Sequence, residues 1–403
     1  MKTTQACCAL ALALALGAHA VGCSSDDETT NGSSSSGGGA SSSSGGAASS
    51  SGGGSSSGNA TSGGPPTNPD DGPAAGWADG KCGSVPAEAQ PESIANPRTV
   101  VGDGTPDSCT GDAFVAAVAK GGVITFNCGA SPKTIILSAE AKVHNDTGPV
   151  VIDGGNKVTL SGGGKTRILY SNACDPANGG YSKGVTGDCN EQVTPKLTVQ
   201  NITFIDGNNQ GPNGEETSGG GAMYIRGGRT KIVNARFFNN QCVATGSDVG
   251  GGAIRILDFP KAGSMARPVI VANSTFGGKT GFGNKCANGG ALSSIGTSWN
   301  IYNSMFSDNH ATGMGANDGN GGNGGAIYND GNTIALNVCG TLMEDNHAPE
   351  GGSAIFFVSN DKSGTIAITD STLRNNPKGK FESQPGMFVQ AKTDPTVTNS
   401  TIQ

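Results

Sequence analysis

One three-residue pattern returns seven times between Lys196 and Gln403. Each copy has Val or Ile, then a turn-forming residue (usually Asn) two positions on, then a large apolar residue three positions further. Successive copies lie 29 to 39 residues apart. This spacing, with short β-branched segments, predicts a solenoid, because each repeat can bury its apolar side chains only against its neighbours. The copies are Val199/Asn201/Phe204, Ile232/Asn234/Phe237, Val271/Asn273/Phe276, Ile301/Asn303/Phe306, Val338/Gly340/Met343, Ile368/Asp370/Leu373 and Val397/Asn399/Ile402.

A second motif precedes five of these copies and consists of Gly-Gly-Ala, or a near variant, followed by an apolar residue. Glycine supplies 68 of the 403 residues and aromatic residues only 5%, which favours tight turns over helices. Stacked strands about 4.8 Å apart would align equivalent side chains. We therefore expect inward apolar ladders and a polar Asn ladder at a bend. The five motifs end in Ala222-Met223, Ala253-Ile254, Ala291-Leu292, Ala326-Ile327 and Ala354-Ile355.

These motifs resemble the GGA-aliphatic and Phe-x-x-Asn repeats of chlamydial polymorphic outer-membrane proteins, and more broadly the parallel β-helices of the pectin-lyase-like superfamily. Phe237–Asn240 and Phe306–Asn309 match the second motif, whereas Lys279 stands at the Asn position after Phe276. The resemblance covers about residues 100–403. It implies an all-β, right-handed parallel β-helix of about nine to ten coils. The superfamily includes lyases, hydrolases, adhesins and passenger domains, so the resemblance specifies fold more than function.

The segment from Cys109 to Gly122 predicts a short helix ahead of the repeats. Thr110 is a suitable N-cap and Gly121 a suitable end. The exposed end of a solenoid needs a cover, so we expect this helix to cap the first coil.

The N-terminus predicts export. In residues 1–22, Lys2 precedes a short apolar run, which is the order of a signal peptide. The run ends in Ala-Val-Gly-Cys, which resembles a bacterial lipobox and implies lipid attachment to Cys23. An ordinary signal peptide before an incidental cysteine is the alternative. Ser24 rather than Asp follows, which in enteric bacteria favours the outer membrane. We expect a lipid-anchored protein that faces the cell surface.

Low-complexity sequence follows the expected anchor. Ser and Gly fill 27 of the 34 positions in residues 31–64, and such a stretch cannot bury a core. We expect a flexible tether over residues 23–80 and the β-helix domain over residues 81–403. The net charge of -7 makes nucleic acid a poor partner, and we expect contact with a membrane only through the lipid.

Eight cysteines follow Cys23, and an exported chain permits disulfides. One pair would fasten the cap to the first coil, a second would close a long loop, and a third would join loops before consecutive Gly-Gly-Ala strands. A zinc site is the alternative, although no Cys-x-x-Cys spacing supports it. Cys82 and Cys339 stay unassigned. The three pairs are Cys109–Cys128, Cys174–Cys189 and Cys242–Cys286.

Alternation along the Gly-Gly-Ala strands places one row of side chains on the outer face. Aromatic rings and Arg at fixed spacing on a solvent-facing strip would suit a polysaccharide, since rings stack on sugars and Arg pairs with hydroxyls or uronates. The alternative is a side-chain ladder that stabilises the sheet and binds nothing. The row is Tyr224, Arg255, Ser293, Tyr328 and Phe356, with Arg226 and Asp330 two residues further along.

Oxygen-rich strings suggest a metal site. Asp-Asn-His-Ala occurs at 308–311 and again at 345–348, so two imidazoles and two carboxylates should stack one coil apart. A loop at 316–325 is rich in Asn, Asp and Gly and could hold Ca²⁺. Duplicated turn motifs without a metal are the alternative. The candidate ligands are Asp308, Asp345 and Asp318.

Three functions are consistent with these observations. The first is a tethered β-helix that binds polysaccharide or a cell-surface glycan, as an adhesin or envelope module. The second is a polysaccharide lyase in which Arg255 or Arg226 abstracts the proton next to a uronate carboxylate. Ca²⁺ would make that proton more acidic. The third is a spacer without a ligand. The sequence leaves open which glycan is bound and which oligomer forms.

Overall fold

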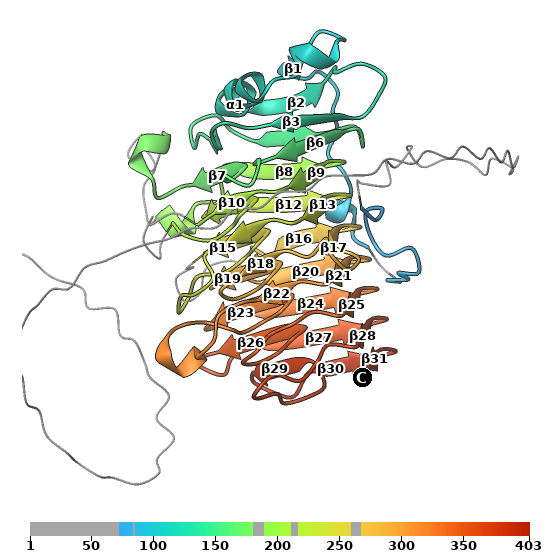
Figure 1. The fold of residues 1–403 in the computed structure, drawn as a ribbon, viewed down its shortest axis with the longest axis vertical. Coiled ribbons are helices and arrows are strands. Elements are labelled where there is room, and N and C mark those ends of the chain that lie inside the picture. The colour runs from blue at the N-terminus through green and yellow to red at the C-terminus, as the bar shows by residue number, and fades with distance from the viewer. Residues whose placement is uncertain (1–71, 84, 180–188, 211–216, 259–266) are drawn as a thin grey trace, which may run out of the picture. The chain divides into compact units, whose positions relative to one another are not determined.

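The computed structural model describes residues 72–83, 85–179, 189–210, 217–258 and 267–403, which belong to one compact unit. The expected signal peptide, Cys23 and the Ser/Gly-rich stretch lie outside the described residues. No helix among the described residues is long and apolar enough to span a membrane. The chain is almost entirely strand and turn (Figure 1).

The strands of the described residues form four sheets, and every pairing between named strands is parallel. We call them sheets A to D. Sheet A contains β1 (Thr99–Val101), β2 (Gly122–Phe126), β5 (Val150–Asp153), β8 (Lys196–Gln200), β12 (Arg229–Val233), β16 (Val269–Ala272), β20 (Trp299–Tyr302), β24 (Ala335–Cys339), β27 (Thr365–Thr369) and β30 (Thr396–Thr398).

Sheets B, C and D complete the circuit. Sheet B contains β3 (Lys133–Ile136), β6 (Val158–Ser161), β9 (Thr203–Ile205), β13 (Arg236–Phe238), β17 (Thr275–Gly277), β21 (Met305–Ser307), β25 (Leu342–Glu344), β28 (Thr372–Arg374) and β31 (Thr401–Ile402). Sheet C contains β4 (Ala141–Val143), β7 (Leu169–Asn172), β11 (Met223–Arg226), β15 (Ile254–Leu257), β19 (Leu292–Ile295), β23 (Ile327–Gly331), β26 (Ile355–Ser359) and β29 (Met387–Gln390). Sheet D contains β10 (Asn208–Asn209), β14 (Gln241–Cys242), β18 (Lys285–Cys286) and β22 (His310–Ala311).

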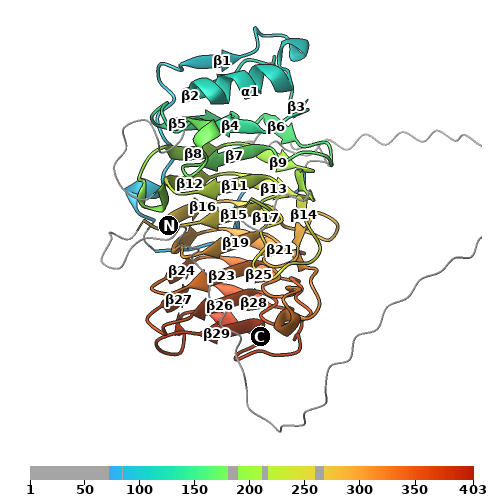
Figure 2. The same cartoon turned by 90° about the vertical axis from the view of Figure 1, so that its left-hand side faces the viewer.

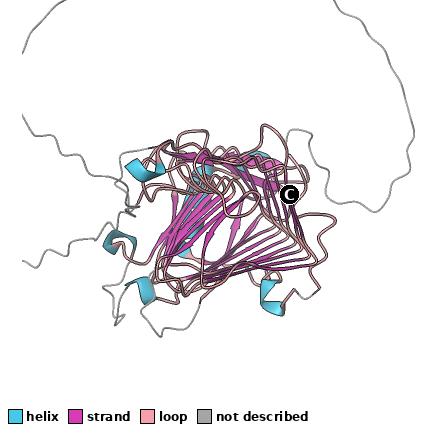
Figure 3. Ribbon diagram, turned by 90° about the horizontal axis from the view of Figure 1, so that it is seen from below, coloured by secondary structure: helices cyan, strands magenta, loops and turns pink. Residues whose placement is uncertain are grey.

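The chain visits these sheets in a fixed order. From β8 it passes through β9 in sheet B, β10 in sheet D and β11 in sheet C, and then returns to sheet A at β12, beside β8. Each circuit is one coil, and Figure 3, which looks along the stack, shows the strands arranged around a common interior. The expected all-β parallel solenoid is confirmed, and the ten strands of sheet A agree with the expected number of coils.

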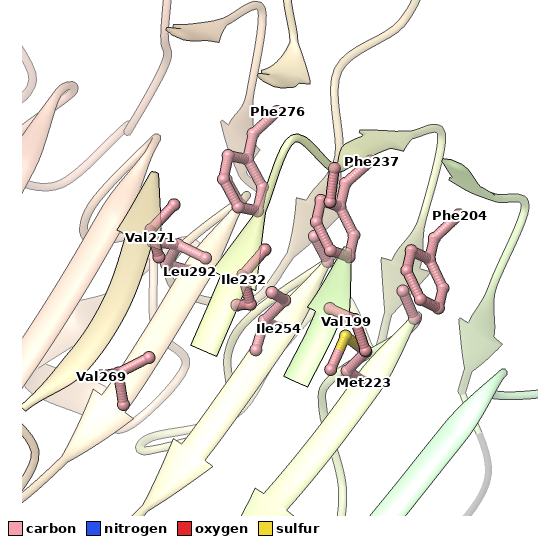
Figure 4. Close-up of a cluster of buried hydrophobic side chains, with 14 of the residues drawn as sticks. Val199, Phe204, Met223, Ile232, Phe237, Ile254, Val269, Val271, Phe276 and Leu292 are labelled. Atoms are coloured by element: carbon pink, nitrogen blue, oxygen red, sulfur yellow. The ribbon is translucent and has the colours of Figure 1, made fainter. Parts of the chain in front are cut away.

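The register of the strands confirms the repeat. Ile232 pairs with both Val199 and Val271 in sheet A, and Phe237 pairs with both Phe204 and Phe276 in sheet B. Neighbouring phenylalanine rings lie nearly parallel, with centroids 4.7 to 4.9 Å apart. Figure 4 shows these rings in one row in the interior. Large apolar side chains therefore form the core by stacking on their own equivalents.

The Asn positions of the repeat do form a bend. Asn201, Asn234, Asn273 and Asn303 all have positive φ, between 44° and 53°, a conformation that Asn tolerates better than most residues. Asn234 donates to Oδ1 of Asn201 at 3.1 Å, as a polar ladder requires. Oδ1 of Asn303 instead accepts from the backbone N–H of Cys82. The bend is thus confirmed, and part of it is used to hold the N-terminal segment.

A second amide ladder lies in the interior. Each Asn after the first accepts, on its Oδ1, the backbone N–H and the Nδ2–H of the Asn one coil earlier, at 2.9 to 3.1 Å. After Phe276 a loop intervenes. The ladder residue is therefore Asn284 and not Lys279, which stands three positions after the phenylalanine. This ladder satisfies amide groups that burial would otherwise leave unpaired. It consists of Asn240, Asn284, Asn309, Asn346 and Asn376.

Helix α1 (Gly111–Lys120) is the predicted cap. The Thr110 side chain accepts a backbone hydrogen bond from the first turn, and Gly121 ends the helix with φ 68°. The helix buries Phe114 and Val118 against the core and packs on β4 and β1 (Figure 2). The short 3-10 helices are η2 (Ala87–Ala89), η3 (Pro106–Ser108), η4 (Pro176–Asn178), η5 (Cys189–Glu191) and η6 (Ala316–Asp318).

Four disulfides join the eight cysteines after Cys23. The three pairs expected from the sequence are confirmed, and the fourth joins Cys82 to Cys339 across a sequence separation of 257 residues. Contacts with the solenoid already begin at Gly72, ahead of position 81 where we expected the domain to start. The N-terminal segment, blue in Figure 1, thus runs along the outside of the coils.

Candidate functional site

The outer row of sheet C has the predicted register but lacks the predicted exposure. Tyr224, Arg255, Ser293, Tyr328 and Phe356 pair in that order across neighbouring strands. Their exposed fractions lie between 0% and 8%. The expectation of a solvent-facing strip that binds glycan through these residues is therefore wrong.

Loops that fold back over sheet C cause this burial. Arg255 donates from Nη1 to the carbonyl of Ser218. Two coils earlier, Arg167 donates to the carbonyls of Thr217 and Gly219, and its guanidinium lies 5.1 Å from the centroid of the Tyr224 ring. The arginines thus hold the covering loop, and the row acts as a side-chain ladder.

The ring faces of this row are also occupied. Tyr170 stacks on Tyr224 with centroids 5.5 Å apart, and Tyr328 stacks on Phe356 at 5.2 Å. A sugar can stack only on a ring face that is open. The geometry therefore supports the structural alternative for Tyr224, Tyr328 and Phe356.

The two candidate catalytic arginines do not meet at an open site. Arg255 is 2% exposed, and burial lowers the pKa of its guanidinium. Arg226 donates from Nε to Oδ1 of Asn190 at 3.0 Å, beside the loop that Cys174–Cys189 closes. A general base must come within hydrogen-bond reach of the substrate, and Arg255 is covered by the loop at Ser218. The arrangement does not favour the lyase.

Asp330 belongs to a small polar cluster at the edge of the same row. The hydroxyl of Tyr328 lies 3.4 Å from both Oδ1 of Asp248 and Oδ2 of Asp330. Asn360 donates to Oδ1 of Asp330 at 2.9 Å. Burial, and then the charge of Asp248, raise the pKa of Asp330 to about 6. The cluster connects the loop at Asp248 to β23.

The candidate metal ligands are placed as follows. Oδ2 of Asp308 accepts the backbone N–H groups of Gly281 and Gly283, and its Oδ1 lies 3.2 Å from Nε2 of His310. Asp345 is exposed and Asp318 lies in η6. Within the described ranges, no group of three or more His, Cys, Asp or Glu residues could hold a metal ion. The Ca²⁺ site stays a prediction.

A different row, along sheet D, does face solvent. Each residue of this row directly follows, in the sequence, a residue of the buried amide ladder or its equivalent in an earlier coil. Because side chains alternate along a strand, the side chain of the second residue points outward. The strands place these residues in register, and the last two meet through a parallel bridge. Lys285 and His347 are exposed and the others are half-buried. We call this row the histidine strip; it consists of Asn208, Gln241, Lys285, His310 and His347.

The two imidazoles of the histidine strip are stacked. The rings of His310 and His347 are parallel to within 3°, with centroids 5.0 Å apart. Burial lowers the pKa of His310, and the hydrogen bond with Asp308 opposes that shift. A neutral imidazole presents one donor and one acceptor, which suits hydroxyl ligands.

A cavity of about 530 Å³ adjoins the last ring of the strip. At its edge, Lys380 forms an ion pair with the buried Glu350 at 2.6 Å, and the same Glu350 oxygen accepts the N–H of Gly315. Glu350 thereby fixes the loop at Gly315 and the loop at Lys380 relative to each other. The cavity is lined by His347, Ala348, Pro349, Pro377, Lys378, Gly379 and Lys380.

The fold defines this chain as a parallel β-solenoid protein. Comparison with protein-family models, curated proteins and solved structures finds no match. The functional assignment therefore rests on the geometry of the chain itself.

Proposed function

We propose that this protein is an exported, surface-tethered β-solenoid that binds polysaccharide along the histidine strip, as an adhesin or envelope module. The observation that supports it most is the in-register stack of the half-buried His310 and the exposed His347, which ends at a cavity. The resemblance of the repeats to the pectin-lyase-like superfamily is consistent with a glycan ligand. Anchoring through Cys23 would place the strip at the cell surface.

The strip suits an extended polymer. Neighbouring coils present one polar side chain about every 4.8 Å along the axis, which is comparable with the advance of one sugar residue in an extended chain. The amide, ammonium and imidazole groups offer hydrogen bonds to successive hydroxyls. Because the buried Asn ladder fixes the backbone behind them, little conformational freedom is lost on binding.

The cavity suits a single sugar ring at the end of the strip. His347 is the last ring of its stack and also lines the cavity. Pro349 and Pro377 add apolar surface for the C–H face of a pyranose, and Lys378 stands at the rim. This combination of a flat apolar wall and a few polar groups is typical of small-ligand sites.

Retention of the full-length protein on a panel of immobilised polysaccharides tests the proposal. We expect one polysaccharide to retain the protein, and His347→Ala and Lys285→Ala each to weaken binding about tenfold, or ~1.4 kcal/mol. Lys196→Ala removes an equally exposed strand lysine in sheet A and serves as the matched control.

Three outcomes would overturn the proposal. Retention that His347→Ala and Lys285→Ala leave unchanged would place the ligand elsewhere. If none of the polysaccharides retained the protein, the spacer function would be favoured instead. Release of unsaturated sugar product during incubation would replace binding with the lyase function.

A further inference from the structure

The described N-terminal segment first crosses several coils towards the C-terminal end. Gly72 lies against the rings of Phe238 and Phe282. Thr275 next bonds the segment twice, since its hydroxyl donates to the carbonyl of Ala74 and accepts the N–H of Gly76. The segment reaches its furthest coil at Cys82, which is bonded to Cys339 of β24.

The segment then turns back across sheet A. Ala89 is 1% exposed and packs with Val233 and Ala272 on the outer face of the sheet. Further on, Glu92 and Gln200 exchange two hydrogen bonds, at 2.7 and 3.0 Å. The chain finally enters β1 next to the cap. Cys82 therefore stands at the tip of a strap that runs out and back, which we define as residues 72–98.

The non-covalent contacts of this strap are separate from one another and can be lost one after another. They are two hydrogen bonds each with Thr275, Asn303 and Gln200, a small apolar cluster around Ala89, and the contacts of Lys231 with Gln90 and Glu92. Without the disulfide, tension on the chain before Gly72 would break these contacts one after another and would then act on β1 and α1. The contacts that hold an interior strand act together, because β24 is paired along its length with β20 and β27.

We infer that the Cys82–Cys339 disulfide is a mechanical clamp that carries tension from the N-terminal tether directly into the interior coil at β24. Tension then bypasses residues 83–98, the cap and the first coils. The other three disulfides lie inside the loop that the clamp closes, between residues 82 and 339. Residues 83–98 of the strap and the N-terminal coils thus stay unloaded while the clamp is intact.

The clamp also lies on the coil that carries the candidate ligand site. From Cys339 the chain passes through β25 and reaches His347 within the same circuit. Tension from a polymer held at His347 would therefore reach the clamp within one coil. This second half of the inference rests on the proposed polysaccharide binding, whereas the clamp itself requires only that tension enters through the N-terminal segment.

Single-molecule pulling on the full-length chain by its two termini tests the clamp. The intact protein should never release residues 83–338. The Cys82→Ser/Cys339→Ser variant should first give a low-force step of at most about 100 Å as the strap peels. Unfolding of residues 99–338 should then add about 600 Å of extension that the intact protein cannot give, with the three shorter disulfides still closed. A Cys82→Val/Cys339→Val variant replaces the serine pair if that pair does not fold.

A matched control uses a disulfide inside the closed loop. Cys174→Ser/Cys189→Ser opens a bond of 15 residues' separation and should add no extension while the clamp is intact. The inference would be overturned if the clamp variant showed no low-force step, because the strap would then hold as firmly as the coils. Equilibrium retention on polysaccharide should be equal for clamp variant and wild type. Failure of retention in both would concern the proposed function alone.

Discussion

The rings of Tyr328 and Phe356 lie parallel to within 1°, with centroids 5.2 Å apart, on neighbouring strands of sheet C. Such a pair covers one face of each ring. A row of aromatic residues at the repeat spacing therefore indicates that the rings hold neighbouring coils together. A ring that binds a ligand is expected at the end of such a row, where no further ring of the row covers its second face. In this molecule such an end lies at His347, beside a cavity.

Arg255→Ala should separate stability from binding. The guanidinium is buried and holds the loop at Ser218, so its loss should reduce the free energy of unfolding by about 2–4 kcal/mol. The folded variant should bind polysaccharide as the wild type does. Arg229→Ala, at an exposed strand position, should change neither quantity, as measured by urea unfolding and by retention. A folded Arg255→Ala protein that lost binding would restore sheet C as the ligand face.

Asn309→Ala should destabilise the interior. Asn309 accepts two hydrogen bonds from Asn284 and donates to Oδ1 of Asn346, so its removal leaves buried amide groups without partners. We expect the free energy of unfolding to fall by about 3 kcal/mol, measured by urea unfolding. Asn337→Ala breaks an exposed pair with Asn300 and should cost less than about 0.5 kcal/mol. Equal losses in the two variants would refute a structural role for the buried ladder.

Phe276→Ala should leave a cavity between two rings. Phe276 stacks on Phe237 at 4.8 Å and on Phe306 at 4.7 Å, and it is fully buried. Removing a buried Phe side chain costs about 3–5 kcal/mol. Phe282→Ala, at a half-buried loop position, is the control and should cost much less. Thermal unfolding followed by circular dichroism measures both, and a small shift in Tm for Phe276→Ala would contradict the stacked core.

Asp330 should make stability depend on pH between about 4 and 6. Its pKa is raised from 3.8 to about 6 in the folded protein, so the folded state binds the proton more tightly than the unfolded state. The resulting stabilisation is present below pH 4 and is lost as pH rises through 6; its magnitude is at most ~3 kcal/mol. Asp330→Asn should remove this dependence. The free energy of unfolding is measured with urea from pH 4 to 7. The prediction fails if this free energy depends on pH in the same way for both proteins.

The repeat predicted the architecture well because solenoid geometry is local. The positions of Val199 and Phe204 are determined within their own repeat. The next coil has the same arrangement because it stacks on this one in register. The N-cap at Thr110 and two of the disulfides were predicted for the same reason, since short segments determine them. The Cys242–Cys286 bond was predicted because its cysteines precede equivalent strands of neighbouring coils.

The exposure of the candidate site could not be predicted in the same way. Alternation along β15 places Arg255 on the outer face, but the loop at Ser218 that covers it is irregular and follows no period. Lys285 was missed because seven residues between Phe276 and Asn284 displace the ladder residue that precedes it. The Cys82–Cys339 bond depends on the path of the strap, which no repeat encodes.

The interruption after Phe276 also shows how a protein of this kind can change. The extra residues leave the stacking of Phe276 on Phe306 and the amide contact of Asn284 with Asn309 intact. The corner of a coil can therefore lengthen, shorten or acquire new chemistry while the coils above and below keep their places. A lineage carrying this scaffold could vary its outer surface one corner at a time, and change what it recognises without having to evolve a new fold.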